Sequence, residues 1–145
     1  MLLTEVFGVF IARTEFSASP VVVLRAEDGR ILPIFIGFAE AASIYSAINR
    51  LVPPRPMTHD LLVDIISKLD AKVEKVIIDD LIDNTFYARI VLKSGEKEIE
   101  IDARPSDGIA IALRAPCPIF VDSKVLDEAG REDIPPNFRD FAEFA

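Results

Sequence analysis

The chain alternates between short apolar runs and turn residues, and this pattern predicts a series of strands and helices. Alternation of apolar and polar side chains over residues 2–12, followed by an apolar run over residues 20–25, predicts two strands. An Asp-Gly turn then leads into a third strand over residues 31–36. Because Pro33 has no N–H to donate, we expect this third strand to lie at an edge of the sheet or to carry a bulge.

Two helices are predicted in the middle of the chain. Residues 38–51 carry apolar side chains at helical spacing, and the proline-rich segment at residues 53–56 ends this helix. Thr58 is the expected N-cap of the second helix. The apolar stripe of the second helix is expected to be its buried face, and it consists of Leu61, Leu62, Ile65, Ile66 and Leu69.

The second half of the chain again has the alternation of strands. Three strands are predicted over residues 73–81, 85–93 and 96–103, the last with one acidic, solvent-facing side. A third helix over residues 104–114 and a short strand over residues 119–121 follow. These elements predict a single compact α+β domain with a mixed, mostly antiparallel sheet and about three packed helices.

The end of the chain differs in composition from the rest. We place the domain at residues 1–126 and an acidic C-terminal tail at residues 127–145, which contains a Pro-Pro break and three phenylalanines. A short helix is expected near residues 125–129. The remainder is expected to be mobile or packed against a partner, so the fold should persist without the tail.

The composition of the chain bears on where in the cell the protein is found. No apolar stretch approaches the ~20 residues of a membrane-spanning helix, and the first residues lack the basic segment and cleavage site of a signal peptide. The single cysteine, Cys117, excludes an internal disulfide and is expected to act as a small buried hydrophobe. With a single histidine as well, the usual Cys/His zinc site is excluded. We therefore predict a cytoplasmic protein that does not enter membranes.

The net charge of −8 limits how the protein could meet nucleic acid. A strongly acidic surface is poorly suited to neutralising many phosphates at once. Transient processing of a nucleic acid, or the binding of metal ions, is still compatible with this charge.

Three polar residues lie where the predicted strand 96–103 gives way to the third helix. Asp102 and Asp107 could together bind a hard divalent cation, and Arg104 beside them could hold a phosphate in a bidentate manner. The alternative is structural, because acidic residues at a helix start stabilise its free N–H groups and its dipole.

His59, the single histidine, stands at the start of the second helix. Histidine is the side-chain type whose unperturbed pKa lies near neutrality, which makes this residue a candidate general base or metal ligand. Arg55, four residues earlier, is a candidate phosphate ligand. Both side chains could equally be ordinary surface groups, since exposed histidine and arginine need no function.

The loop that contains Asp83 is rich in possible oxygen ligands, which also include Asp79, Asp80 and Asn84. Asp-Asn is also an ordinary turn pair, so the two interpretations stay open. No nucleophile motif, P-loop or dinucleotide-binding fingerprint is present in the sequence. Covalent catalysis and nucleotide-cofactor chemistry are therefore unsupported at this level.

Several segments together resemble the bifunctional nuclease domain family. In the first half these are Leu32-Pro33-Ile34-Phe35-Ile36-Gly37 with Glu40-Ala41, and Arg55-Pro56-Met57-Thr58-His59-Asp60-Leu61-Leu62. In the second half they are Asp83-Asn84-Thr85-Phe86-Tyr87-Ala88, Ile101-Asp102-Ala103-Arg104-Pro105-Ser106-Asp107 and Pro118-Ile119-Phe120-Val121. The resemblance covers about residues 1–126. It implies a cytosolic α+β fold, commonly a homodimer, and nuclease activity on both DNA and RNA.

The resemblance and the candidate residues together suggest a metal-assisted phosphodiesterase. In this hypothesis Asp102 and Asp107, with Asp83, hold Mg²⁺ or Mn²⁺, which activates water and neutralises charge on the phosphate. His59 acts as general base or supports the metal ligands. Arg55 and Arg104 orient the phosphate.

The alternative hypothesis is a non-catalytic dimeric module that binds a ligand or a partner protein through the same polar residues. In either case we expect a homodimer that buries aromatic surface, with Phe138 and Phe141 as candidates. The metal-assisted mechanism requires that His59, Asp83, Asp102 and Asp107 converge in one cleft.

Overall fold

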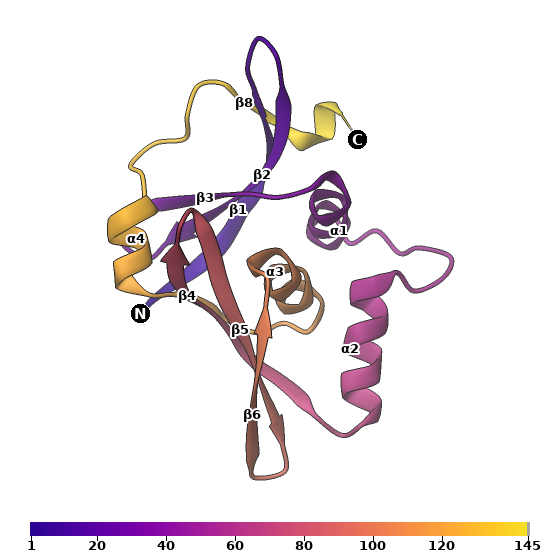
Figure 1. The fold of residues 1–145 in the computed structure, drawn as a ribbon. Helices are drawn as coiled ribbons and strands as arrows, with labels where there is room; N and C mark the ends of the chain where they lie inside the picture. Colours follow the sequence, from indigo (N-terminus) through magenta and orange to yellow (C-terminus); the bar gives the residue numbers. More distant parts are fainter. Residues whose placement is uncertain (145) are drawn as a thin grey trace.

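An eight-stranded sheet and four α-helices make up residues 1–144, the part of the chain that this computed structural model describes (Figure 1). The strand order is β3-β2-β1-β7-β4-β5-β6, and β8 pairs with β1 beside this path. All strand pairs are antiparallel except β4 with β7. The predicted α+β class, with a mostly antiparallel sheet, is confirmed.

The N-terminal half of the sheet consists of β1 (Leu2–Arg13), β2 (Ala18–Ala26) and β3 (Ile31–Phe35), which pair consecutively. Every β2 residue from 21 to 24 is fully buried, as expected for the apolar run there. Strand β3 is one edge of the sheet. Pro33 therefore lies in an edge strand, as its missing N–H predicts.

The C-terminal half is a second antiparallel set, formed by β4 (Lys72–Ile82), β5 (Thr85–Ser94) and β6 (Lys97–Ala103). The short β7 (Ile119–Val121) joins the two halves, because it pairs antiparallel with β1 and parallel with β4. This insertion makes one continuous sheet from two locally paired sets of strands.

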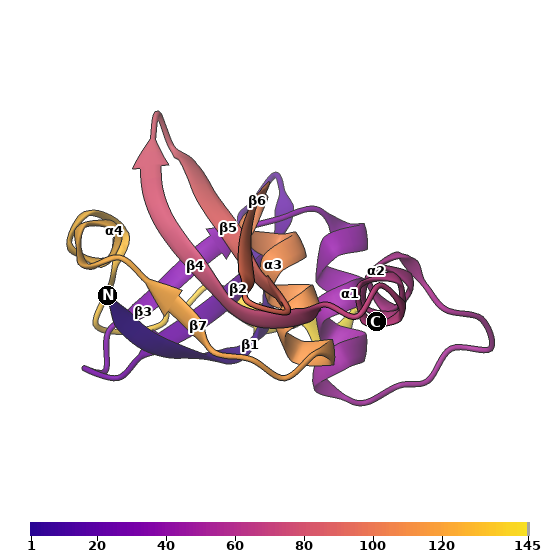
Figure 2. The same cartoon turned by 90° about the horizontal axis from the view of Figure 1, so that it is seen from below.

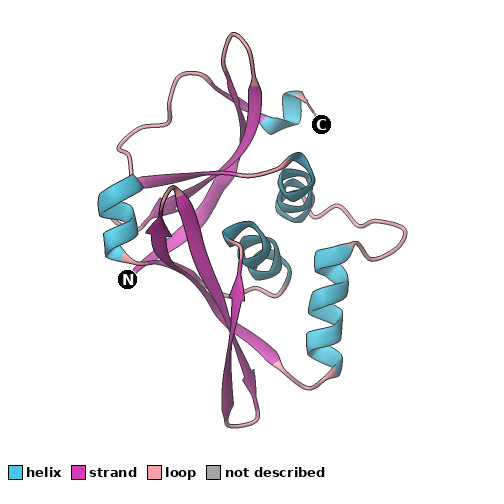
Figure 3. Ribbon diagram, in the orientation of Figure 1, coloured by secondary structure: helices cyan, strands magenta, loops and turns pink. Residues whose placement is uncertain are grey.

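Helices α1 (Phe38–Ile48), α2 (Thr58–Lys68) and α3 (Pro105–Arg114) lie together on one side of the sheet (Figures 1 and 3). Helix α3 packs on β4 and β5 and also contacts both α1 and α2. Helix α4 (Ser123–Ala129) lies at the opposite side of the molecule from α2 in both views (Figures 1 and 2). The three clustered helices hold the polar residues discussed below.

The expected buried face of α2 is wrong for this chain. Four of the five apolar residues in the predicted stripe are exposed, namely Leu61, Leu62, Ile65 and Leu69. The helix instead turns His59, Val63 and Ile66 inward, at positions i, i+4 and i+7. His59 can be buried because both of its ring nitrogens have hydrogen-bond partners on neighbouring helices. The apolar stripe is therefore left on the surface.

The end of the chain is packed rather than mobile, contrary to expectation. Strand β8 (Phe138–Asp140) pairs with β1, and the 3₁₀ helix η1 (Phe141–Glu143) follows it. Phe141 is 5% exposed and lies in the core, with its ring centroid 5.4 Å from that of Tyr45. An aromatic side chain buries more apolar area than most, which explains why this short segment is held in place.

The same packing affects the two phenylalanines expected at a dimer interface differently. Phe141 is buried within its own chain. The ring of Phe138 lies 6.2 Å from that of Phe10 and 6.4 Å from that of Phe35, measured between centroids. These contacts are intramolecular, but Phe138 keeps part of its surface exposed, so only Phe141 is excluded from a dimer interface.

Two further expectations can be compared with the structure. No helix within residues 1–144 is long and apolar enough to cross a membrane. Cys117 is partly buried against the core, and this burial raises the pKa of its thiol to about 11. A thiol with such a pKa is inert at neutral pH, which agrees with the expected structural role of Cys117.

Candidate functional site

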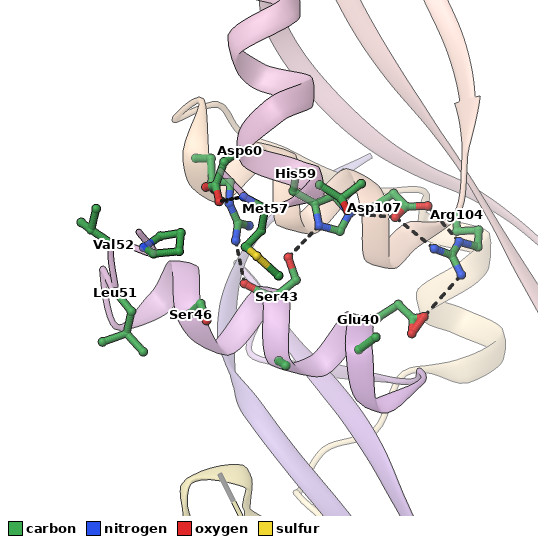
Figure 4. A pocket seen from close by; sticks show the side chains of 15 residues that line it. Glu40, Ser43, Ser46, Leu51, Val52, Met57, His59, Asp60, Arg104 and Asp107 are labelled. Carbon is green, nitrogen blue, oxygen red and sulfur yellow. Dashed lines mark hydrogen bonds and ion pairs between the residues drawn. The ribbon is translucent and has the colours of Figure 1, made fainter. Parts of the chain in front are cut away.

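A pocket of ≈ 490 Å³ opens between α1, α2 and the start of α3 (Figure 4). One part of its wall is polar, and the other part is formed by apolar residues of the loop between α1 and α2. The polar wall includes Glu40, Ser43, His59, Asp60, Arg104, Asp107 and Arg114. The apolar wall includes Leu51, Val52, Pro53 and Met57.

His59 lies at the centre of the polar wall. It is the second residue of α2 and is only 8% exposed, because this face of the helix turns toward α1 and α3. Its Nδ1 atom lies 2.6 Å from Oγ of Ser43 on α1, and its Nε2 atom lies 2.8 Å from Oδ1 of Asp107 on α3. Both distances are those of good hydrogen bonds. The imidazole therefore links three helices (Figure 4).

The carboxylate of Asp107 is also bound by Arg104. Arg104 is the N-cap residue of α3, and Asp107 is the third residue of this helix. The Arg104 Nε and Nη2 atoms donate to Oδ2 and Oδ1 of Asp107 at 2.8 and 3.1 Å, which is a bidentate pair. The guanidinium also approaches Glu40, with Nη1 3.5 Å from Oε2, and it remains 65% exposed at the edge of the pocket.

These contacts determine the charge of Asp107. Burial acts to raise the pKa of this carboxyl, but hydrogen bonds from Arg104 and His59 outweigh burial and hold its pKa below the usual range. The carboxylate is therefore ionised at neutral pH. The same hydrogen bonds to Asp107 raise the pKa of the Arg104 guanidinium.

A second ion pair lies in the wall of the same pocket. The Nε atom of Arg114, the last residue of α3, donates to Oδ1 of Asp60 at 2.8 Å, and its Nη2 atom donates to the carbonyl oxygen of Ser43 at 3.0 Å. The hydrogen bond from Arg114 lowers the pKa of Asp60. Asp60 also accepts from the backbone N–H of Met57 at 3.0 Å, at the start of α2. These bonds fix α1, α2 and α3 relative to one another.

The structure brings three of the predicted site residues together and separates the others. His59, Asp107 and Arg104 form one connected cluster. Asp83 occupies the tight turn between β4 and β5, with a φ of 50°. Arg55 is exposed in the loop that connects α1 with α2. The hypothesis of a single cleft containing His59, Asp83, Asp102 and Asp107 therefore needs correction.

Asp102 points away from the helices. It lies opposite Arg89 in the β5–β6 pair, and residues directly opposite each other share a face of the sheet. Arg89 also lies opposite Ile77 of β4, so these two side chains share a face of the sheet as well. The residue before Ile77, Val76, faces α3. Successive side chains of a strand point to opposite faces, so Asp102 is on the face that α3 does not cover.

The residues present do not form the predicted metal centre. Within residues 1–144, no group of three or more His, Cys, Asp or Glu side chains is arranged to hold a metal ion. Both carboxylate oxygens of Asp107 are engaged, Oδ1 by His59 and Arg104 and Oδ2 by Arg104. The set of Asp83, Asp102 and Asp107 is therefore not assembled as ligands in this chain.

Sequence reasoning missed Ser43 and Arg114. Ser43 lies in α1 and carries no motif, and it is 16 residues from His59, which in turn is 48 residues from Asp107. One signal was present in the sequence, because Ser43 directly precedes Ile44, one of the apolar residues at helical spacing in the predicted helix 38–51. A polar residue beside a buried stripe is expected to find a hydrogen-bond partner.

Comparison with known proteins gives a family and several relatives. Residues 22–133 match the family model described as "Bifunctional nuclease domain". An uncharacterised protein of Mycobacterium tuberculosis is 46% identical over 112 residues, which are 77% of this chain and 66% of the relative. "Bifunctional nuclease 2" of Oryza sativa subsp. japonica is 32% identical over 127 residues, 84% of this chain and 39% of the relative.

A further plant relative, "Bifunctional nuclease 1" of Arabidopsis thaliana, is 26% identical over 125 residues, which are 83% of this chain and 38% of the relative. The chain thus spans a little under two thirds of the mycobacterial relative and well under half of the plant relatives. The family match includes α1, α2 and α3, and therefore every residue of the polar wall. On this match, the chain belongs to the bifunctional nuclease domain family.

Proposed function

We propose that this protein is a nuclease that hydrolyses phosphodiester bonds of DNA or RNA at the pocket between α1, α2 and α3. The observation that supports the proposal is the chain of hydrogen bonds Ser43–His59–Asp107, which lies in the wall of this pocket. An imidazole held between a carboxylate and a hydroxyl is the arrangement that hydrolases use to move protons. The plant relatives named bifunctional nucleases support the choice of substrate.

In this proposal His59 accepts and returns the proton during hydrolysis. Asp107 accepts a hydrogen bond from Nε2, which orients the ring and stabilises the positive charge that forms on it. Arg104 holds Asp107 in place and also has an exposed guanidinium at the edge of the pocket. Its contact with Glu40 is long, at 3.5 Å, so a substrate phosphate could replace Glu40 there.

The charge of the protein favours a short or transient contact with the substrate. With a net charge of −8, affinity cannot come from many phosphate contacts along a strand. Arg104 supplies one phosphate contact in the pocket, and Arg55 on the adjoining loop is proposed to supply a second. Two arginines match a single-stranded end or loop better than a long duplex, since each neutralises one phosphate.

Dependence on Mg²⁺ or Mn²⁺ stays a prediction from the sequence. The mechanism above is written with side chains of this chain alone, because the predicted ligands are not assembled. Measuring cleavage with each cation and with a chelator separates the two cases. Cleavage that continues in chelator supports hydrolysis by the His59 cluster, and cleavage that stops would restore a metal to the proposal.

We also propose that the protein is a homodimer, as its family resemblance implies, and that the apolar stripe of α2 forms the interface. Leu61, Ile65 and Leu69 lie on one side of this helix and are 46–71% exposed. Apolar surface of this kind is normally covered by a partner. A cytoplasmic location, predicted from the sequence, is part of the same proposal.

Assembly is tested by light scattering at micromolar concentration, with Ile65→Glu as the variant. We expect a dimer for the unmodified protein and a monomer for the variant. Ile101→Glu on the edge strand β6 is the matched control, since Ile101 is similarly exposed at 41%. A monomeric mass for the unmodified protein rejects the proposed dimer.

Nuclease function is tested with end-labelled single-stranded DNA and RNA oligonucleotides. We expect cleavage by the purified protein and a loss of about 10²-fold or more in His59→Gln and Asp107→Asn. Asp102→Asn is the control, because this residue has the same chemistry but lies on the other face of the sheet. All variants are purified in parallel, so a contaminating nuclease would appear equally in every sample.

Three outcomes contradict the proposal. Equal cleavage by the unmodified protein, His59→Gln and Asp107→Asn would place the reaction elsewhere or in a contaminant. No cleavage with either substrate, with Mg²⁺, Mn²⁺ or chelator, would favour the binding module that the acidic charge also fits. Loss of activity in Asp102→Asn alone would return the site to the outer face of the sheet.

A further inference from the structure

The hydrogen bonds of His59 determine which of its nitrogens carries the proton. The ionised carboxylate of Asp107 can only accept, so Nε2 of His59 must donate to it. In the neutral imidazole the other nitrogen, Nδ1, is then the acceptor. Its partner at 2.6 Å is Oγ of Ser43, so the Ser43 hydroxyl donates to His59.

This tautomer restricts the proton that His59 can take. The ring side chain is only 10% exposed, and its accepting nitrogen is directed at Ser43. A water molecule would have to displace the Ser43 hydroxyl in order to reach Nδ1. The group that His59 is placed to deprotonate is therefore the hydroxyl of Ser43.

The contact is not the usual one for a serine inside a helix. A helical serine commonly returns its hydroxyl to a backbone carbonyl of the preceding turn. Ser43 in α1 instead makes a short bond across to α2, and its side chain lines the pocket (Figure 4). Ser46, one turn further along α1, also lines the pocket but has no bond to the imidazole. The two serines therefore provide a natural comparison.

We propose that Ser43 is a nucleophile that attacks the phosphorus atom of the substrate, with His59 as its general base and Asp107 as the residue that orients His59. The choice of a phosphodiester as substrate rests on the proposed function. The hydrogen-bonded order hydroxyl–imidazole–carboxylate carries the inference, because it recurs on several unrelated folds in enzymes that use an activated serine.

In the first step, Oγ of Ser43 bonds to phosphorus while its proton passes to Nδ1 of His59. The P–O bond to one nucleoside breaks, and that oxygen takes the proton from Nδ1 as it leaves. In the second step, a water oxygen bonds to phosphorus and gives its proton to Nδ1. The bond between phosphorus and Ser43 then breaks, and Oγ recovers the proton. One water is consumed and no oxidant or reductant is needed.

Two groups in the pocket wall can stabilise negative charge on the phosphoryl oxygens. The first-turn N–H groups of a helix have no partner within the helix, and the first turn of α2, Thr58 to Asp60, lines the pocket. The guanidinium of Arg104 lies beside Asp107. Both groups favour negative charge where the phosphoryl oxygens would lie.

The test uses diisopropyl fluorophosphate, which phosphorylates activated serines, with intact-mass analysis and peptide mapping of the adduct. We expect one adduct at Ser43 in the unmodified protein and in Ser46→Ala. His59→Gln and Asp107→Asn should form the adduct at least about 10²-fold more slowly, because the base is lost or misdirected. Absence of an adduct at Ser43 overturns the proposal, and so does a labelling rate that is the same in His59→Gln.

A second variant covers the case in which removing the Ser43 hydroxyl disturbs folding. Ser43→Cys keeps a nucleophile at this place, and its alkylation by iodoacetamide should be at least about tenfold faster than that of Ser46→Cys, since a neighbouring histidine promotes the thiolate. Cys117 gives little background, because burial raises its pKa to about 11. Equal rates for the two cysteine variants count against the proposal.

Cleavage of labelled oligonucleotides separates this inference from the proposed nuclease function. An adduct at Ser43 without any nucleic-acid cleavage keeps the nucleophile and rejects the nuclease. Cleavage that is unchanged in Ser43→Ala, when this variant melts at the same temperature as the unmodified protein, keeps the nuclease and rejects the nucleophile.

Discussion

Nε2 of His59 lies 2.8 Å from Oδ1 of Asp107, and this single contact joins the first turn of α2 to the first turn of α3. Each residue alone has an ordinary explanation at a helix start. Their contact removes a histidine from water and gives it a fixed orientation. The pair therefore has consequences for stability as well as for chemistry, and these can be measured separately.

The dependence of stability on pH follows from the lowered pKa of Asp107. Burial opposes the shift, but hydrogen bonds from Arg104 and His59 prevail. A carboxyl with a lower pKa in the folded protein contributes stability above its unfolded pKa of about 3.9, and this contribution is lost as pH falls through the folded pKa. The difference in unfolding free energy between the unmodified protein and Asp107→Asn should therefore shrink below about pH 4. Denaturant unfolding from pH 7 to 3 measures it, and a constant difference contradicts the prediction.

Arg114 is predicted to be the most important charged residue for holding the three helices together. Its side chain is 12% exposed, and it donates to Asp60 on α2 and to the carbonyl of Ser43 on α1. Arg114→Met should lower the unfolding free energy by about 1–3 kcal/mol, because it leaves partly buried acceptors without a donor. Arg89→Met is the control, with an expected effect below about 1 kcal/mol, since its ion pairs with Asp79 and Glu100 are partly exposed at the surface of the sheet. Comparable losses in both variants would contradict this role.

The C-terminal segment is predicted to belong to the folded core. Phe141→Ala should cost about 3–5 kcal/mol, the usual range for a large aromatic removed from a core. Removal of residues 138–145 should cost more, because β8 then no longer pairs with β1. Phe144→Ala is the control with a small expected effect, since Phe144 is 45% exposed. If the truncated protein unfolds cooperatively at an unchanged temperature, the segment is not part of the core.

Gly108 is predicted to be required for the close packing of α3 on β4. A Cβ atom at this position would lie 2.7 Å from Cγ1 of Val76. The change Gly108→Ala gains about 1 kcal/mol in helix propensity, but overpacking a core typically costs about 1–3 kcal/mol. We therefore expect a lower melting temperature for Gly108→Ala.

A double-mutant cycle identifies the cause of this loss. Val76→Ala removes the methyl groups that the new Cβ would meet, so Gly108→Ala should be stabilising in that background. If Gly108→Ala has the same effect with and without Val76, then crowding against this side chain does not explain the glycine.

Local sequence patterns predicted the strands and helices well, for a physical reason. Alternation in β5 and the apolar run in β2 reflect which backbone positions face the core, and turn residues such as Gly29 mark where the chain reverses. Secondary structure of this kind depends on neighbours within a few positions. Edge strand β3 could be foreseen for the same reason, because the missing N–H of Pro33 is a property of one residue.

The orientation of α2 could not be obtained in this way. Its sequence contains an apolar stripe with Leu61 and Ile65 and another stripe with His59, Val63 and Ile66. Helical spacing identifies both stripes, but it does not determine which of them packs against the rest of the chain. The packing against α1 and α3 selects the stripe that contains His59, since partners for both ring nitrogens are available there.

The candidate site itself was decided by tertiary structure. Asp102 and Asp107 are close in sequence, yet one ends on the outer face of β6 and the other faces the pocket, because the change from strand to helix between them reorients the side chains. Ser43 lies in no motif and meets His59 only when α1 packs beside α2. The sequence by itself determined the elements and the family, through patterns that neighbouring residues set. Which polar groups meet depended on long-range packing, since hydrogen bonds across three helices follow from the positions of the helices and not from spacing along the chain.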